Sequence, residues 1–307
     1  MKSQHNNCPS RYLAITLSIL ANLLLGLSSL YWRALGDIPS TTLVAYRIVV
    51  SAVILTCLVL IFRHAYQIKH YTIKLVCLHA IASILIAINW AAFILASING
   101  YLLESGLGYL LAPFISIALG AVVYREHLTT RKTLSTVIAF CAIAALIIST
   151  KQLNHWTYVL IASTWGAYTY IKKSTSLDAI NGLLIETLFL AICLALAIML
   201  FELPIVWPYE LPKQSGHLIW LAGWASIIPL LMFSYATGKI PLSITGFIQF
   251  ILPLTLFTLA LLFRTQAISN TSLMLIISTA SLLITLITYD LIKPRQPQRR
   301  TQNEKRL

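Results

Sequence analysis

Long apolar runs recur along the entire chain, and they constrain its fold more than any other feature. A helix needs about 20 apolar residues to cross the hydrocarbon core of a bilayer. With 58% hydrophobic and only 10% charged residues, the 307-residue chain also has too little polar surface to cover a soluble globule. We therefore expect an all-α integral membrane protein with ten transmembrane helices. The ten runs cover residues 12–32, 42–62, 73–95, 105–124, 133–149, 156–171, 179–201, 218–236, 243–263 and 272–291.

The net charge of +13 is distributed unevenly among the connections between these runs. The N-terminal tail and the connections after the even-numbered runs hold 17 of the 22 Lys and Arg residues, whereas the connections after the odd-numbered runs hold 4. Cytoplasmic loops carry an excess of Lys and Arg, so this alternation predicts that both termini lie in the cytoplasm. The basic tail at 292–307 is expected to fix the topology and to meet anionic headgroups rather than nucleic acid.

The sequence also matches itself at an offset of 140 residues. This offset superposes the five runs of residues 12–149 on the five runs of residues 150–291, between the tails at 1–11 and 292–307. Because five is an odd number, the second half must enter the membrane in the opposite direction. The pattern predicts two inverted five-helix repeats, an arrangement typical of transporters that alternate between openings on opposite sides.

Glycine and proline recur at equivalent places in both halves. The offset places Gly106 on Gly246 and Pro113 on Pro253, each pair within an apolar run. Small residues let helices approach closely, and a proline removes a backbone hydrogen bond. Both features are common in membrane helices, but their recurrence favours a role in gating. We expect helix breaks at these four residues, in the walls of a central cavity.

Three stretches of sequence carry a resemblance to a known family. They are NWAAFILASINGYLLESGLGYLLAPFISIALGAVVYREHLT (Asn89 to Thr129), INGLLIETLFL (Ile180 to Leu190) and LSITGFIQFILPLTLFTLALLF (Leu242 to Phe263). They resemble the signatures of the RarD branch of the EamA-type drug/metabolite transporter superfamily, and the resemblance extends over nearly the whole chain.

The resemblance implies a bundle of two inverted five-helix halves, with a substrate cavity formed chiefly by helices 1 to 4 and 6 to 9. It also implies secondary transport of small metabolites or drugs, often outward; RarD proteins are commonly labelled chloramphenicol-sensitivity permeases. Members usually carry Gly-Glu at the ends of helices 4 and 9. Here Glu126 is present without its glycine, and Gln266 stands where the second acid is expected.

Polar side chains inside the apolar runs are candidate substrate-binding residues, because an ionisable residue in a span costs about 2.5 to 3.5 kcal/mol. We hypothesise that Arg47 and Glu186 face one pathway and offer opposite charges to a zwitterionic or polar solute. The alternatives are that Arg47 snorkels to the outer interface and that Glu186 caps a local polar network. If transport is coupled to protons, Glu186 is the leading carrier. The other candidates are Asn89 and Gln249, because an unpaired amide deep in a span is costly, and the aromatic residues Trp90, Tyr109 and Tyr168, for which an interface belt or packing is the alternative role.

The sequence contains no recognisable catalytic, nucleotide-binding or metal-binding motif, and its five cysteines form no C-x-x-C pair. We expect no cofactor. The predicted function is an exporter or permease in the cell inner membrane, moving amino-acid-like or chloramphenicol-like solutes by alternating access. Its partners would be the solute and the bilayer, not nucleic acid, and a homodimer remains open. The alternatives are an integral-membrane lipid-handling protein or enzyme, and a purely structural membrane protein.

Overall fold

The chain folds into helices. The computed structural model describes residues 8–61, 72–149, 153–211 and 216–263, together with five isolated residues between 274 and 285. Strands are absent from these described residues. The helices are α1 (Cys8–Ala34), α2 (Ser40–Ile61), α3 (Ile73–Ile98), α4 (Leu102–Val122), α5 (Thr130–Ser149), α6 (His155–Ser174), α7 (Ala179–Phe201), α8 (Ala222–Lys239), α9 (Leu242–Gln249) and α10 (Ile251–Leu262), with short 3₁₀ turns η2 (Pro208–Glu210) and η3 (Leu218–Leu221).

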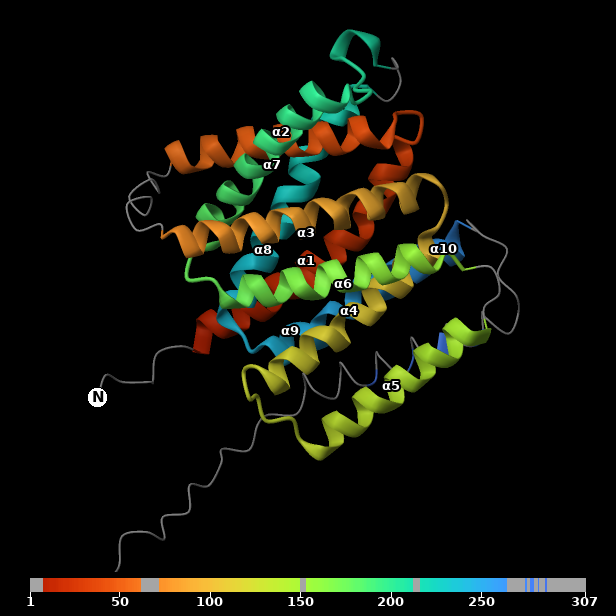
Figure 1. Ribbon diagram of the computed structural model, residues 1–307. Coiled ribbons are helices and arrows are strands. Elements are labelled where there is room, and N and C mark those ends of the chain that lie inside the picture. Colours follow the sequence, from red (N-terminus) through yellow and green to blue (C-terminus); the bar gives the residue numbers. More distant parts are fainter. Residues whose placement is uncertain are drawn as a thin grey trace, which may run out of the picture.

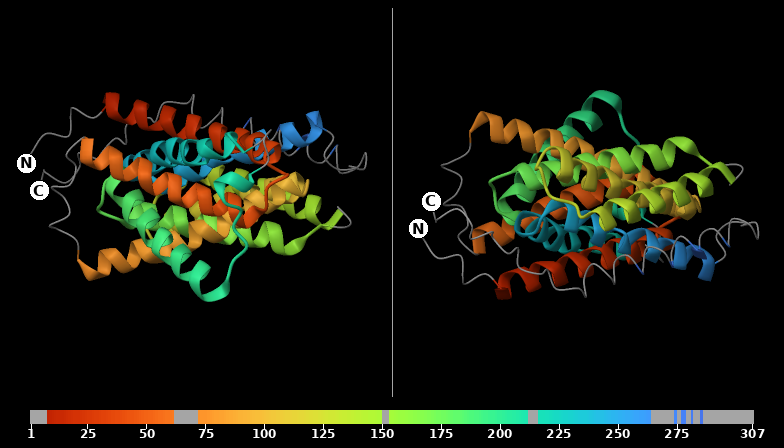
Figure 2. Two further views of the ribbon diagram at one scale, coloured as in Figure 1. Left: turned by 90° about the horizontal axis from the view of Figure 1, so that it is seen from above. Right: turned by 90° about the horizontal axis from the view of Figure 1, so that it is seen from below.

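The helices lie side by side in one elongated bundle (Figures 1 and 2). Helix α6 packs against α3 and α4, while α1 packs against α8 and α10. Helices α2 and α7 contact each other, as do α4 and α9. Helix α5 lies at the edge of the bundle, where its contacts are mainly with α4 (Figure 1). The centre is therefore formed by elements from both ends of the sequence.

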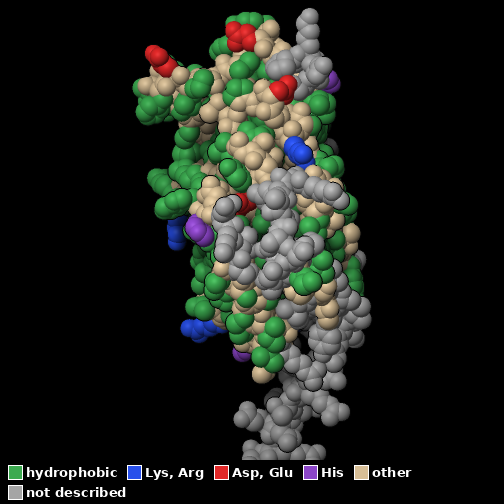
Figure 3. Space-filling view, turned by 90° about the vertical axis from the view of Figure 1, so that its right-hand side faces the viewer, with side chains coloured by type: hydrophobic (Ala, Val, Ile, Leu, Met, Phe, Trp, Pro, Cys, Tyr) green, Lys and Arg blue, Asp and Glu red, His purple; other side chains and the backbone are tan. Residues whose placement is uncertain are grey.

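Seven helical segments in the described residues are long and apolar enough to cross a membrane. Their outward side chains are apolar: Val53, Ile84 and Leu196, for example, are each about half exposed or more. Hydrophobic side chains spread over much of the face in Figure 3, with scattered charges. This surface fits a lipid environment and identifies an all-α membrane protein. The segments are Arg11–Ala34, Ser40–Ile61, Ile73–Ile98, Leu102–Val122, Ala179–Phe201, Leu218–Lys239 and Leu242–Leu262.

The two predicted proline breaks differ in outcome. Helix α4 continues through Pro113, whereas the run predicted at 243–263 is divided at Phe250 into α9 and α10. The break is explained by Pro253, which has no N–H to bond the carbonyl of Gln249 one turn earlier. The predicted span at 272–291 lies almost entirely outside the described residues, apart from a few isolated helical positions.

Two of the predicted glycines lie where helices cross closely. A Cβ on Gly106 of α4 would lie 2.5 Å from the Phe257 ring of α10. A Cβ on Gly246 of α9 would lie 2.8 Å from the Ile117 side chain of α4 and 3.1 Å from the carbonyl oxygen of Pro113. Neither position has room for a methyl group, so glycine permits the contact between α4 and the α9–α10 segment.

A second pair of glycine contacts follows the same arrangement. A Cβ on Gly26 of α1 would lie 2.7 Å from Thr255 of α10, and one on Gly166 of α6 would lie 2.8 Å from Ile115 of α4. Gly26 and Gly166 are 140 residues apart, and so are their partners, with the two halves exchanged. The contacts of Gly106 and Gly246 have the same relation. Close crossings thus occur in equivalent pairs at the offset seen in the sequence.

Candidate functional site

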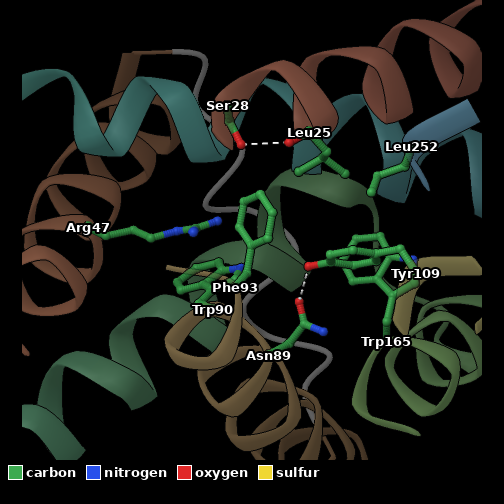
Figure 4. Close-up of a pocket in the computed structure, with 9 residues that line it drawn as sticks. All are labelled: Leu25, Ser28, Arg47, Asn89, Trp90, Phe93, Tyr109, Trp165 and Leu252. Carbon is green, nitrogen blue, oxygen red and sulfur yellow. Dashed lines mark hydrogen bonds between the residues drawn. The ribbon is translucent and has the colours of Figure 1, made fainter. Parts of the chain in front are cut away.

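A small pocket lies inside the bundle (Figure 4). The space open to the centre of a water molecule is about 10 Å³, which is room for about one water. Four of the predicted residues meet in its wall: Arg47 from α2, Asn89 and Trp90 from α3, and Tyr109 from α4. None of the nine lining residues is acidic. The remaining five are Leu25, Ser28, Phe93, Trp165 and Leu252.

Arg47 is buried among aromatic rings. Its side chain extends from α2 towards the pocket, and the residue is only 3% exposed (Figure 4). The guanidinium carbon lies 3.9 Å from the centre of the Trp90 ring and 5.1 Å from that of Trp32. Within the described part of the chain, Nε and Nη1 have no hydrogen-bond partner. The side chain thus lies inside the protein as a cation held by rings.

Asn89 is fixed in place by three partners. Its amide oxygen accepts a 2.7 Å hydrogen bond from the Tyr109 hydroxyl, while its amide nitrogen donates to Thr164 Oγ1 at 3.1 Å and to the Ile161 carbonyl at 3.2 Å. These bonds join α3, α4 and α6. A buried amide without partners would be costly, and here its oxygen and nitrogen are both bonded. Asn89 therefore shapes the pocket wall as a preorganised group.

Glu186 of α7 lies in a separate buried cluster. Its Oε1 is 2.7 Å from His79 Nδ1 and 2.9 Å from Lys172 Nζ, and its Oε2 accepts a 3.0 Å hydrogen bond from the Tyr168 hydroxyl. His79 Nε2 lies 2.8 Å from Thr175 Oγ1. All three residues around the carboxylate are buried. Both oxygens of Glu186 are thus engaged within the protein, and Glu186 does not line the pocket.

A line of aromatic rings connects the pocket to this cluster. Tyr109 meets Trp165 edge to face, with ring centres 5.7 Å apart, and Trp165 stacks on Tyr168 with centres 5.8 Å apart. Tyr168 then bonds Glu186. Trp165 and Tyr168 come from the same face of α6, so a rotation of this helix would move both. Packed aromatic side chains therefore connect the pocket wall to the Glu186 cluster.

Known proteins resemble this chain over most of its length, although no family model matches it. The transporter YojE of Bacillus subtilis, called uncharacterized, is 35% identical over 239 residues, covering 74% of this chain and 78% of YojE. Protein RarD of Escherichia coli is 27% identical over 261 residues, covering 81% and 85%. The chloramphenicol-sensitive protein RarD of Pseudomonas aeruginosa is 25% identical over 260 residues, covering 82% and 86%.

The chain belongs to the RarD-type transporter family. One solved crystal structure, described only as that of a protein, aligns with 90% of this chain and 99% of its own length. Its TM-score is 0.65 at 17% sequence identity, which shows likeness of fold alone. The RarD relatives support a membrane transporter, which is the coarse function that the sequence predicted.

Gln249 lies apart from the pocket in this RarD-type chain. Its amide nitrogen donates to Thr169 Oγ1 at 2.9 Å, and its amide oxygen accepts from Ser116 Oγ at 3.2 Å. It thereby joins α9 to α6 and α4, just before the break at Phe250. Of the seven residues predicted to bind substrate, four line the pocket, and Tyr168, Glu186 and Gln249 lie in neighbouring polar contacts.

Glu126, the acid retained after α4, binds the N-terminus of α9. Its two carboxylate oxygens accept hydrogen bonds from the backbone N–H groups of Leu242 and Ser243, at 2.8 and 2.9 Å. A carboxylate is favourable at a helix N-terminus, where N–H groups lack partners within the helix. Glu126 therefore ties the loop after α4 to the second half of the chain. Gln266 lies outside the described residues.

Sequence reasoning missed two members of the buried cluster. His79 lies inside the predicted span at 73–95. An ionisable imidazole within a span is, like Arg47 and Glu186, a candidate functional residue. Lys172 was assigned to a cytoplasmic loop because it follows the run at 156–171. In the structure α6 continues to Ser174, and Lys172 turns inward to Glu186. The hydropathy of the sequence does not show that α6 extends to Ser174, and this extension is what places Lys172 within the helix.

Proposed function

We propose that this RarD-type protein is a secondary transporter that exports or exchanges small metabolites or drug-like solutes by alternating access. It would cross the inner membrane ten times, as two inverted five-helix repeats with both termini in the cytoplasm. The pocket around Arg47 and Asn89 is the substrate site of this proposal. The observation that carries it is that this buried polar pocket is built from both halves, by α1 to α4 together with α6 and α10.

The paired glycine contacts support the repeat part of the proposal. Contacts at Gly26 and Gly166, and at Gly106 and Gly246, recur at the 140-residue offset with the halves exchanged. Such equivalence is expected if each half can adopt the conformation of the other, which is how inverted repeats produce two openings. Gly106, Gly246, Pro113 and Pro253 would then be the points about which the helices move.

The size of the pocket supports a closed conformation. Ligand sites for drug-sized molecules have volumes of about 300 to 1,000 Å³, far more than the space for one water found here. A solute can therefore enter only if helices around the pocket move apart. Glu126 of the first half bonds the start of α9 in the second half, and Lys173 of α6 bonds the loop that precedes α9. Both contacts would hold this side closed.

The proposal is tested by counterflow with purified protein in liposomes, using phenylalanine, a nucleoside, chloramphenicol and phenylacetate, each with and without a pH gradient. Trp165→Phe alters the pocket wall, and Trp156→Phe is its control, because Trp156 lies on the same helix but is 83% exposed. We expect saturable movement of at least one solute, with KM raised by Trp165→Phe and unchanged by Trp156→Phe.

Equal KM values for the two tryptophan variants would contradict the assignment of the pocket. A folded protein that moves none of the solutes would contradict the transport proposal. Scrambling of a fluorescent phospholipid in the same vesicles would then favour the lipid-handling alternative.

A further inference from the structure

Arg47 is a buried cation, and the described residues that line its pocket include no acidic side chain to pair with it. Its guanidinium is covered by the rings of Trp90 and Trp32, and two of its nitrogens lack hydrogen-bond partners within the described residues. Ring faces attract a cation, but they accept no in-plane hydrogen bonds from a guanidinium. A buried charge of this kind is costly unless a partner neutralises it. Since no acidic side chain is among the described residues that line the pocket, an anionic ligand would supply the missing partner.

We propose that the pocket binds a small organic monoanion, whose carboxylate pairs with Arg47 and whose flat apolar body lies among Trp90, Phe93 and Trp165. This inference rests on the proposed function and names its substrate class. A guanidinium matches a carboxylate in geometry, with two parallel N–H donors to two oxygens. The rest of the wall is aromatic or aliphatic apart from Ser28, Asn89 and Tyr109.

The contacts of Glu186 favour an anion over a zwitterion as the substrate. The sequence suggested that Arg47 and Glu186 offer opposite charges to one solute, but Glu186 already contacts Lys172, His79 and Tyr168. An ammonium group entering the pocket would find no free carboxylate there. The amide acceptor on the wall, Asn89 Oδ1, already accepts a hydrogen bond from Tyr109. The pocket therefore has an unmatched positive charge and no unmatched negative charge.

The first test compares three probes that share a phenyl ring: phenylacetate, its neutral amide phenylacetamide, and zwitterionic phenylalanine. Equilibrium binding to the purified protein is measured by competition with radiolabelled phenylacetate. Hydrogen bonds to charged groups contribute enough to make phenylacetate roughly tenfold to hundredfold tighter than the amide. Phenylalanine should bind more weakly than phenylacetate. Equal affinity for acid and amide, or no saturable binding of phenylacetate, overturns the proposal.

The second test replaces the cation. Arg47→Gln should weaken phenylacetate binding by roughly tenfold to hundredfold and leave phenylacetamide binding unchanged. Arg47→Lys keeps the charge without the planar fork and should give an intermediate affinity. Arg33→Gln is the control, since Arg33 is exposed and outside the pocket, and should change neither affinity. An acid-to-amide ratio that Arg47→Gln does not change overturns the proposal.

The third test needs no ligand. If Arg47 awaits an external anion, the empty protein carries an uncompensated charge, and Arg47→Gln should raise its melting temperature. If Arg47 serves only to hold Trp90 and Trp32, the same change should lower it, which overturns the proposal. Failure of the transport proposal looks different. If neutral solutes show saturable counterflow that Arg47→Gln does not change, the transport proposal stands and the anion proposal fails. If no solute moves, both proposals fail.

Discussion

At the scale of single residues, the two intramembrane charges have opposite solutions to the same energetic problem. Glu186 forms an ion pair with Lys172 and contacts His79, whereas Arg47 is covered by the aromatic rings of Trp90 and Trp32. A buried ion pair contributes little net stability. Removing one partner is destabilising, however, because it leaves the other charge buried and uncompensated. Glu186 therefore has its partners inside the bundle, whereas Nε and Nη1 of Arg47 have no hydrogen-bond partner among the described residues.

Lys172→Met and Glu186→Gln are each expected to lower the free energy of unfolding by about 3 kcal/mol, because each leaves a buried partner uncompensated. The double variant should recover much of this loss, since both charges are then absent. The free energies of unfolding of the wild type, the two single variants and the double variant are measured in mixed detergent micelles, with circular dichroism as the signal. Lys239→Met is the control because Lys239 is exposed, and it should have little effect. Additive losses in the double variant would show that the pair is not coupled.

At the scale of helices, close crossings depend on glycines whose neighbours cannot yield. The methyl group of Ala at position 246 would meet the backbone carbonyl of Pro113 as well as Ile117. At Gly106 the obstacle is the ring of Phe257, which is only 3% exposed and tightly packed. Similar glycines elsewhere need not matter: a Cβ on Gly238 would meet nothing within 4 Å. The environment, rather than the residue type, decides the effect.

Gly106→Ala and Gly246→Ala are each expected to destabilise the protein by about 1 to 3 kcal/mol, the usual cost of overpacking. Gly238→Ala should be neutral or stabilise by up to about 1 kcal/mol, because Ala favours helix and has room there. Melting temperatures in one detergent compare the three variants. Adding Phe257→Leu should restore part of the loss in Gly106→Ala. A loss at Gly238 as large as at the other two would refute the packing argument.

At the scale of the whole molecule, contacts at one end of the bundle tie the loop after α4 and the end of α6 to the start of α9. Glu126 follows α4 and binds the first N–H groups of α9, and Lys173 at the end of α6 donates to the carbonyl of Ile240. On the positive-inside prediction this end faces the cytoplasm. These contacts lie outside the pocket, and under the proposed function they join helices that would separate when a solute enters.

Glu126→Ala is expected to favour opening at this end, because it leaves two N–H groups of α9 without their acceptor. In a cysteine-free background, Ser116→Cys reports on opening, since Ser116 is fully buried between the pocket and this end. Its labelling rate by a maleimide should rise severalfold with Glu126→Ala. Glu210→Ala is the control, since the Glu210 carboxylate accepts a hydrogen bond from the Trp207 N–H of its own local turn. Equal labelling in both variants would exclude Glu126 as a tie.

The sequence by itself determined the class of protein, most helix positions and the pairs of glycine and proline that mark the crossings. These are properties that run along the chain: hydropathy over about 20 residues and recurrence at a fixed offset. Of the seven candidate residues that stand out in the apolar runs, four line the pocket, whereas Tyr168, Glu186 and Gln249 do not. Only the tertiary structure decided which charges are satisfied. Partners such as Lys172 and His79 depend on how each helix is rotated and where it ends, and neither is encoded in periodicity alone.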